Sequence, residues 1–386
     1  MKIRHLATLC IVFLMLLSGC KSSRPISVSE DEPTSQRSES TSTTTSTTLP
    51  PSSDSTSDDS SSDDSSSEDS STSENLANEE VSFLTNSYVY GNTNGNTHNN
   101  GLATYDFNRK LHYYANKGKI YSYNPETKER ITISSGSSNI KYLTLYEDKL
   151  FFVAGETQYL FCRDLVTSES NFVIDRTVNY VSRQTTYLYV KTTIPEYGSE
   201  DEWFIYYKAD TMQRVIELKK IQSVNLEDGL IIFHTSTEPT TLRLMANNMM
   251  GQNTIKNFAS LGFSSIEHAL FLQNDYYDST KRVFFFILKS DEGEFLYLYE
   301  QSTDTITFID NQYAYHSFNC DDKYLYYASN TGIHVYNYVT KTYDRTISFA
   351  STVRNINVIN RYLYFETGVS DMYRYNLITN RSELVS

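Results

Sequence analysis

A short run of apolar and aromatic residues recurs seven times within residues 81–386. The copies begin about 40 residues apart, with one longer gap of about 50 residues between the fourth and the fifth. They are LHYY at 111–114, LFFV at 150–153, YLYV at 187–190, LIIF at 230–233, VFFF at 283–286, YLYY at 324–327 and YLYF at 362–365. A repeat of this length with several strands per unit is typical of an all-β propeller. We therefore predict a β-propeller of seven blades, each with four antiparallel strands. Six or eight blades are the alternatives, because the fourth and fifth copies are the least regular.

Each unit contains four strand-like segments separated by turn residues. In the second unit they are NIKYLTLYE, KLFFVAG, QYLFCRDL and SNFVID, and in the last unit VRNINVIN, RYLYFET, MYRYNLI and SELVS. The turn after the third segment recurs as YNPETKE, YNYVTKT and YNLITNR, all of which contain the Asn that turns favour. Tyrosine and β-branched residues suit strands that pack face to face between blades. A helical period competes only around residues 242–262.

A propeller ring has to join its first and last blades, and the sequence offers two ways of doing so. Residues 86–91 (NSYVYG) could pair beside the C-terminal SELVS and complete the last blade with a strand from the other end of the chain. Alternatively, SELVS ends the last blade and GLATYDF opens the first, without exchange of strands.

The N-terminus has the pattern of a secretory signal. Lys2 and Arg4 precede an apolar run from Leu6 to Leu17, which is shorter than the roughly 20 residues needed to span a bilayer as a helix. The run ends in Leu17-Ser18-Gly19-Cys20, which resembles the lipobox of bacterial lipoproteins. The resemblance implies cleavage before Cys20, so that residues 1–19 are the signal peptide and Cys20 is lipidated. An ordinary signal peptide with a chance cysteine is the alternative.

Residues 20–80 predict a disordered tether. They contain no aromatic residue, and residues 21–80 hold fourteen acidic and three basic residues among many Ser and Thr. Such a segment cannot bury enough apolar surface to offset the entropy of ordering. The tether therefore accounts for most of the net charge of −14, and it would hold the folded domain, residues 81–386, away from the membrane. Wall-spanning stalks of Gram-positive lipoproteins are similar to this segment.

The start of the folded part resembles a known class of domain. Residues 91–107 (GNTNGNTHNNGLATYDF), followed by KLHYYAN and KIYSYN, resemble the opening of a bacterial propeller family that is similar to the YWTD propellers of low-density-lipoprotein receptors. The resemblance covers most of 86–386 and is weakest around 240–285. This chain has NPET, NYVT or NLIT where the family's hairpins often have an Asp-Gly turn. Membership would imply a propeller fold and an extracellular position, but no particular reaction.

The residues that usually carry chemistry form no recognisable motif. Cys162 and Cys320 lie in different units, in a strand and a loop, so we expect two unpaired thiols and no zinc site. Strand-borne histidines such as His112 and His334 are expected to be packed, and no catalytic, cofactor or metal residues are predicted. The Asn/Gly segment 91–101 could offer oxygens to Ca²⁺, but turns are the favoured interpretation because Asn and Gly are typical turn residues.

Two insertions interrupt the repeat and are the candidates for partner binding. One is IPEYGSEDEW at 194–203, which contains Tyr197 and Trp203, and the other lies in 240–282 and contains Tyr276 and Tyr277. Exposed Tyr and Trp side chains are common anchors of interfaces. A Trp203 packed between blades is the competing interpretation.

The favoured function is a non-enzymatic binding or scaffolding propeller on the extracytoplasmic face of the cell membrane. Its expected partner is an envelope protein or glycan, the chain is expected to be a monomer, and the acidic balance disfavours nucleic acid. One alternative is an envelope glycan-processing hydrolase or lyase with an active site in the central channel. Its acids and histidines would have to converge from several inner strands, which are poor in carboxylates. Another alternative is a ligand-sensing accessory lipoprotein of a membrane complex.

Overall fold

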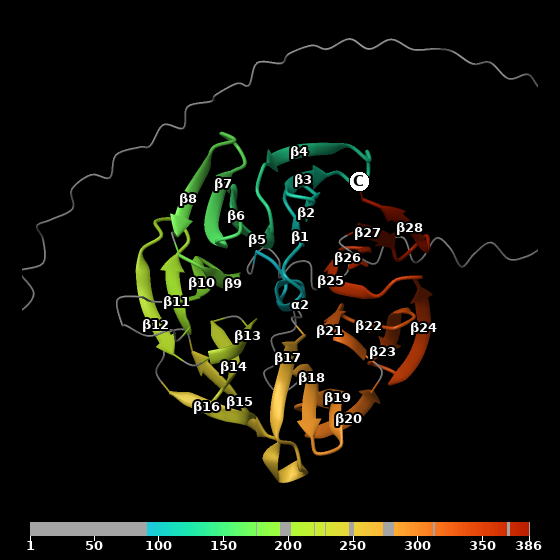
Figure 1. Ribbon diagram of the computed structural model, residues 1–386. Helices are drawn as coiled ribbons and strands as arrows, with labels where there is room; N and C mark the ends of the chain where they lie inside the picture. The colour runs from blue at the N-terminus through green and yellow to red at the C-terminus, as the bar shows by residue number, and fades with distance from the viewer. Residues whose placement is uncertain are drawn as a thin grey trace, which may run out of the picture. The chain divides into compact units, whose positions relative to one another are not determined.

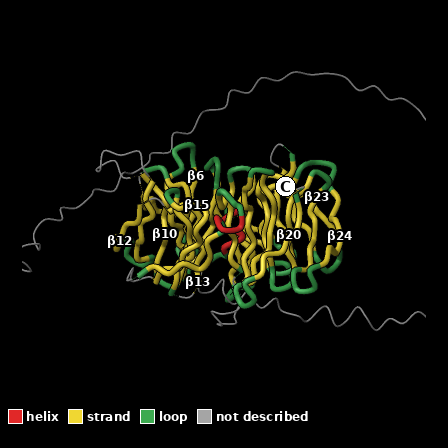
Figure 2. The backbone as a smooth tube through the Cα atoms, turned by 90° about the horizontal axis from the view of Figure 1, so that it is seen from below, coloured by secondary structure: helices red, strands yellow, loops and turns green. Residues whose placement is uncertain are grey.

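Seven four-stranded antiparallel sheets surround a central axis in the computed structural model (Figure 1). The structure describes residues 91–174, 176–193, 202–219, 221–227, 229–246, 251–272, 282–311, 313–368 and 371–385. Each blade consists of four strands that are consecutive in the chain, and the strands run across the thickness of the ring (Figure 2). The prediction of a seven-bladed all-β propeller is therefore confirmed.

The strands fall into four concentric sets. The inner strands are β1 (Ala103–Asp106), β5 (Lys141–Tyr146), β9 (Val178–Gln184), β13 (Ile221–Glu227), β17 (Ser265–Phe271), β21 (Tyr313–Cys320) and β25 (Val353–Ile359). The second strands are β2 (Leu111–Asn116), β6 (Lys149–Ala154), β10 (Tyr187–Thr193), β14 (Leu230–Thr235), β18 (Val283–Ser290), β22 (Tyr324–Ser329) and β26 (Tyr362–Thr367). The third strands are β3 (Lys119–Tyr123), β7 (Tyr159–Asp164), β11 (Glu202–Lys208), β15 (Glu238–Ala246), β19 (Gly293–Glu300), β23 (Gly332–Asn337) and β27 (Asp371–Asn376). The outer strands are β4 (Arg130–Ser135), β8 (Ser170–Ile174), β12 (Arg214–Lys219), β16 (Gln252–Asn257), β20 (Thr305–Asp310), β24 (Thr342–Ser348) and β28 (Arg381–Leu384).

All seven recurrent apolar runs are second strands. Such a strand has strand neighbours on both edges and other blades against both faces, so successive residues are buried instead of alternating with exposed ones. Phe284, Phe285 and Phe286 in β18 are each 0% exposed. The outer strands β4 and β28 are instead largely exposed. The core thus lies between the blades, and the second strands form its centre.

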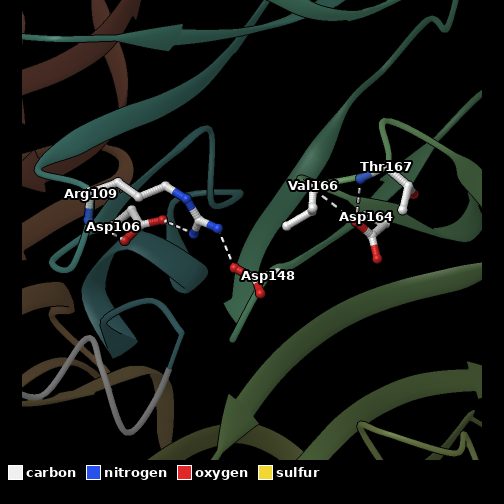
Figure 3. A network of polar contacts seen from close by, with 6 residues as sticks. All are labelled: Asp106, Arg109, Asp148, Asp164, Val166 and Thr167. Carbon is white, nitrogen blue, oxygen red and sulfur yellow. Dashed lines mark hydrogen bonds and ion pairs between the residues drawn. The ribbon is translucent and has the colours of Figure 1, made fainter.

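The turn between the third and outer strands has one construction in several blades. In the second blade, the Asp164 side chain accepts hydrogen bonds of 2.8 Å from the backbone N–H groups of Val166 and Thr167 (Figure 3). Asn124, Asn337 and Asn376 accept the equivalent pairs of bonds in three other blades. The residue four positions after each of them has a positive φ, 65° at Ser168 for example. Asx turns therefore take the place of the Asp-Gly turns expected from the family resemblance.

The ring closes without exchange of strands in the described residues. The last blade consists of β25 to β28, all from the C-terminal end of the chain, and β1 opens the first blade. One apolar cluster spans this junction and includes Ala103 and Tyr114 of the first blade and Tyr364 of the last. The arrangement matches the second of the two predicted closures. Residues 86–90 of the first alternative lie outside the described part.

Two further expectations concern helices. The helical period around 242–262 proved misleading, because this stretch forms the end of β15, β16 and only a short 3₁₀ turn, η3 (Ala259–Leu261). Residues 1–90, which include the predicted signal peptide, Cys20 and tether, lie outside the described residues. In the described part, no helix has the length and apolar character needed to cross a membrane.

Candidate functional site

The Asn/Gly segment forms a short helix, α2 (Asn94–His98), inside the ring (Figures 1 and 2). Thr93 caps the helix, since its hydroxyl accepts a 3.1 Å hydrogen bond from the Asn96 N–H. The first four residues of α2 are buried. Positive φ angles occur only at its borders, at Gly91, Asn100 and Gly101. The sequence predicted turns here, whereas the structure shows a helix that fills the central channel.

Asparagine side chains attach α2 to the inner strands around it. Asn94 pairs with Leu226 of β13: its amide donates to the Leu226 carbonyl at 3.1 Å and accepts from the Leu226 N–H at 2.9 Å. Asn96 pairs in the same way with Val358 of β25, at 3.0 and 2.6 Å. Asn99, which follows the helix, donates to the Phe318 carbonyl of β21 at 2.8 Å. One segment thus connects blades that are far apart in the sequence.

A second set of amides connects neighbouring inner strands directly. Asn225 of β13 bonds the Ala269 carbonyl and the Phe271 N–H of β17, both at 2.9 Å. Asn319 of β21 donates to Ile356 of β25 at 2.8 Å, and Asn357 of β25 accepts from Ala103 of β1 at 3.2 Å. These residues were not predicted from the sequence. The signal was present as an amide at the same place in VNLE, FNCD and INVI, three inner strands.

The channel is consequently a packed polar core. A Cβ at Gly95 would overlap the Asn319 side-chain oxygen, so only glycine allows this approach between helix and strand. The amides along α2 are occupied by backbone groups of the inner strands. A channel-centred active site of the kind considered from the sequence would compete with α2 for the same space.

A cavity of about 780 Å³ lies at one mouth of the channel, at the carboxyl ends of β1, β5 and β9. Arg109 donates to Asp106 at 2.7 Å and also bonds Asp148, which belongs to the next blade (Figure 3). The Arg183 guanidinium lies over the Tyr146 ring, 5.3 Å from its centroid. Phe107, also in the lining, is 40% exposed. The cavity therefore offers aromatic surface and charges of both signs.

A second cavity of about 410 Å³ lies at the opposite mouth. β5 and β9 contribute early residues, Tyr142 and Tyr180, to this cavity and late residues, Tyr146 and Arg183, to the larger one. α2 forms part of its wall with His98. The two cavities thus lie on opposite faces of the ring, with the helix between them.

Histidines gather in the second cavity, although no histidine motif appears in the sequence. His98 of α2, His234 of β14 and His268 of β17 all line it. His98 Nδ1 lies 3.1 Å from His268 Nε2. Burial lowers the pKa of His98 to about 4 and also that of His234 to about 4, so both rings are neutral at pH 7. The sequence could not show this convergence, because the three residues lie up to 170 positions apart.

The predicted partner-binding residues are only partly described. Tyr197, Tyr276 and Tyr277 lie outside the described residues, as does Cys20. Trp203 is a half-buried residue of β11, paired with Thr192 of β10 and Lys219 of β12. It is therefore borne on a strand, as in the competing interpretation.

The described strand ends that flank the two insertions lie on different faces of the ring. By the antiparallel order, the strand ends that flank residues 194–201 lie on the face of the smaller cavity. Those that flank residues 273–281 lie on the face of the larger cavity.

The remaining candidates match their structural interpretations. Cys162 and Cys320 are unpaired thiols, as predicted, although Cys320 is the last residue of β21 and not part of a loop. Burial raises the pKa of Cys162 to about 11, which leaves little nucleophilic thiolate at pH 7. His112 is fully buried, with its Nδ1 2.9 Å from the Tyr364 hydroxyl, and His334 packs edge-on against Tyr327.

Comparisons with known proteins leave the function open. No family model and no curated protein sequence matches the chain, so the resemblance to YWTD propellers stays a prediction. Among solved structures, the AfRom2 CNH domain is similar, with a TM-score of 0.49 and 9% identity over 69% of this chain and 89% of that one. Kluyveromyces lactis Hsv2 has a TM-score of 0.46 and 11% identity over 77% and 97% of the two chains. A Pyrococcus horikoshii acylaminoacyl peptidase has a TM-score of 0.49 and 10% identity over 74% of this chain and 49% of its own. These weak likenesses do not distinguish binding from catalysis.

Proposed function

We propose that the chain is a non-enzymatic binding propeller of the cell envelope, which holds a protein or glycan partner at the larger cavity. The observation that carries this proposal is the filled channel. α2 occupies the place where inner-strand side chains of several blades would have to converge on a substrate. A partner would then bind at the mouths of the channel and on the faces of the ring.

The lining of the larger cavity has the chemistry of recognition. Its volume of about 780 Å³ lies in the range common for ligand sites. Among its described lining residues there is no His or Cys, whereas Phe107, Tyr146, Arg109 and Asp148 provide stacking surface and paired charges. Aromatic and arginine side chains are the residues that most often dominate binding energy.

The face around this cavity also exposes apolar residues. The Asx turns of the second, sixth and seventh blades present Val166, Val339 and Ile378, which are 69%, 64% and 41% exposed. These turns join third and outer strands, so they lie on the same face as the larger cavity. Apolar side chains exposed on the same face as a polar pocket suit a macromolecular partner better than a small solute.

The same proposal includes lipid anchoring. The lipobox-like Leu17-Ser18-Gly19-Cys20 supports attachment through Cys20, and residues 20–80 would act as a spacer. With two or three acyl chains, such anchoring is stable, whereas one chain binds membranes only marginally. The partner would then lie on the extracytoplasmic side of the membrane.

The test is crosslinking of the full-length chain to partners in the envelope fraction of cells that express it. Phe107→Ala and Arg109→Gln should each reduce saturable capture at least about tenfold, which corresponds to about 1.4 kcal/mol. Phe172→Ala and Arg381→Gln are matched controls on exposed outer strands and should leave capture unchanged. Cys20→Ala should move the protein out of the membrane fraction without weakening capture by solubilised envelope. If neither cavity substitution reduces the amount of partner captured, the proposal is wrong.

A further inference from the structure

Two imidazole rings meet at the mouth that carries the smaller cavity. His98 comes from α2 and His268 from β17, and their nitrogens Nδ1 and Nε2 are 3.1 Å apart. The ring planes cross at 86°. The other nitrogen of His98, Nε2, lies 2.9 Å from the Val224 carbonyl of β13. Three elements of the fold therefore fix the His98 ring.

The hydrogen bonds determine which nitrogen carries the proton. A carbonyl oxygen only accepts, so His98 Nε2 must carry the hydrogen and donate it to Val224. The neutral ring therefore has its lone pair on Nδ1. That lone pair faces His268 Nε2. A histidine whose N–H donates to a backbone carbonyl while its other nitrogen is bare has the arrangement typical of metal ligands.

The surroundings favour a cation. The described lining of this cavity contains no Lys or Arg, whereas the larger cavity contains Arg109 and Arg183. Glu267, which is exposed, supplies a carboxylate, and His234 supplies a third imidazole. The side chain of His234 is 4% exposed, and its Nδ1 has no hydrogen-bond partner among the described residues. Neutral imidazoles and a carboxylate without a competing cation suit a late first-row transition metal.

We propose that His98 Nδ1 and His268 Nε2 bind one divalent transition-metal ion, of the Cu²⁺, Ni²⁺ or Zn²⁺ class, at this mouth. This site goes beyond the proposed partner binding and does not depend on it. It also departs from the sequence analysis, which predicted no metal site.

The separation of the two nitrogens defines the geometry. With metal–nitrogen bonds of about 2.1 Å, nitrogens 3.1 Å apart subtend about 95° at the metal. This angle suits two neighbouring positions of a tetragonal or octahedral ion. Among the described residues, no three His, Cys, Asp or Glu side chains are already placed around one point. The ion would therefore be held by two imidazoles, with its other positions open to the cavity, where His234, Glu267 or water can approach.

Binding requires one proton to move. In the metal-free state, His268 Nε2–H donates to His98 Nδ1, because the latter carries the lone pair. On binding, solvent carries the His268 proton from Nε2 to Nδ1, so that the ring stays neutral, and the lone pair of Nε2 then binds the ion. No oxidation or reduction is involved.

The test is calorimetric titration of the full-length, metal-stripped chain without a histidine tag, using Cu²⁺, Ni²⁺ and Zn²⁺ separately. One saturable equivalent is expected, together with nitrogen hyperfine structure in the electron paramagnetic resonance spectrum of the Cu²⁺ form. His98→Gln and His268→Gln should each weaken binding at least about tenfold. Glutamine keeps an N–H donor at both positions, so the melting temperature should change little. His334→Gln, in β23 of the sixth blade, is the matched control and should bind as the unaltered chain does.

Two results would overturn the inference. One is the absence of saturable binding by all three ions. The other is binding that survives in the His98→Gln/His268→Gln double variant, which would place the metal elsewhere in the chain, for example on the acidic residues of 21–80. If both single variants also lose their fold, the Cu²⁺ spectrum of the unaltered chain decides. Nitrogen splitting supports two bound imidazoles, whereas a spectrum without it, as expected for binding to the acidic residues of 21–80, overturns the inference.

Discussion

At the scale of single residues, the asparagine side chains of α2 make hydrogen bonds that a backbone peptide group would otherwise make. A side-chain amide has one acceptor and a donor pair in a plane, as a peptide group does. Asn94 and Asn96 each bond both the N–H and the carbonyl of one strand residue, as a residue of a neighbouring strand would. The channel is thereby closed with strand-like hydrogen bonds but without a further strand.

These roles were only partly predictable from the sequence. The Asn/Gly composition of 91–101 identified an unusual segment, but the same composition is typical of turns. The partners of Asn94 and Asn96, Leu226 and Val358, lie 132 and 262 positions away. Local sequence patterns contain no information about contacts at such distances, so the position of α2 in the channel could not be predicted from them.

Asp321 provides a prediction on pH dependence. It follows β21, and its carboxylate accepts hydrogen bonds from the Tyr326 hydroxyl at 2.5 Å and the Tyr324 N–H at 2.6 Å. Burial nevertheless outweighs these bonds and raises the pKa of Asp321 to about 6. The folded state therefore holds this proton more tightly than the unfolded state does. The contribution of Asp321 to stability is full below about pH 4 and is lost as the pH rises through 6.

The measurement is urea unfolding of the unaltered chain and of Asp321→Asn between pH 4 and 7. Relative to Asp321→Asn, the unaltered chain should lose about 2 kcal/mol of unfolding free energy between pH 4 and pH 7. Subtracting the two curves cancels the histidines, which titrate in both proteins. A difference that stays constant with pH would show that Asp321 is ionised throughout.

At the scale of elements, the second strands were predictable and the inner strands were not. A strand that is buried on both faces needs a run of consecutive apolar residues, and LHYY, LFFV and VFFF stand out for this reason. The inner strands combine apolar and amide residues. One edge of each pairs with the second strand of its own blade, and the other edge faces α2 and the inner strands of neighbouring blades. The apolar residues of 242–262 also fit a helical period, so a helix could be expected there. The beginning of this stretch instead continues β15, which pairs with Phe233 and its neighbours in β14.

Two glycines in equivalent hairpins give a matched prediction. Gly293 opens β19 with φ 133° and Gly332 opens β23 with φ 140°. A Cβ at Gly332 would overlap the Ile347 carbonyl of β24, whereas at Gly293 the nearest atom is 3.6 Å away, in the Phe295 side chain. Both alanine substitutions cost backbone strain, but only one adds a clash with backbone.

Gly332→Ala should therefore lower the unfolding free energy by at least about 2 kcal/mol more than Gly293→Ala does. Chemical denaturation of the two variants beside the unaltered chain measures this directly. Equal losses would mean that the outer strand β24 moves freely enough to make room.

At the scale of the whole molecule, the number of blades followed from counting repeats, whereas the mode of closure did not. Seven second strands require seven sheets, but both closures contain these same seven second strands. The clean junction leaves the first and last blades joined by side-chain packing and by hydrogen bonds, among them Ala103 to Asn357, His112 to Tyr364 and Asn116 to the Val385 carbonyl. α2 bonds strands on both sides of the channel and so adds a tie across the ring.

Removing this tie should destabilise the whole ring. A chain that begins at residue 102 is expected to melt about 10 °C or more below one that begins at residue 81, because buried strand groups lose their partners. Thermal unfolding followed by circular dichroism gives both values. A synthetic peptide of residues 91–101 should restore part of the loss, and the same peptide with Asn94 and Asn96 replaced by alanine should not. Identical melting temperatures of the two chains would refute this role of α2.

The position of α2 at the start of the domain has a consequence for how the protein reaches its native state. Asn96 leaves the ribosome early, yet its partner Val358 follows 262 residues later. Until then Asn96 lacks its partner strand, and the aromatic second strand of the first blade lacks the neighbouring last blade. Contacts of such long sequence separation slow folding and lengthen the life of aggregation-prone intermediates. The chain should therefore fold late and all at once, with residue 385 already emerged, and its biogenesis should depend on a chaperone that protects the nascent blades.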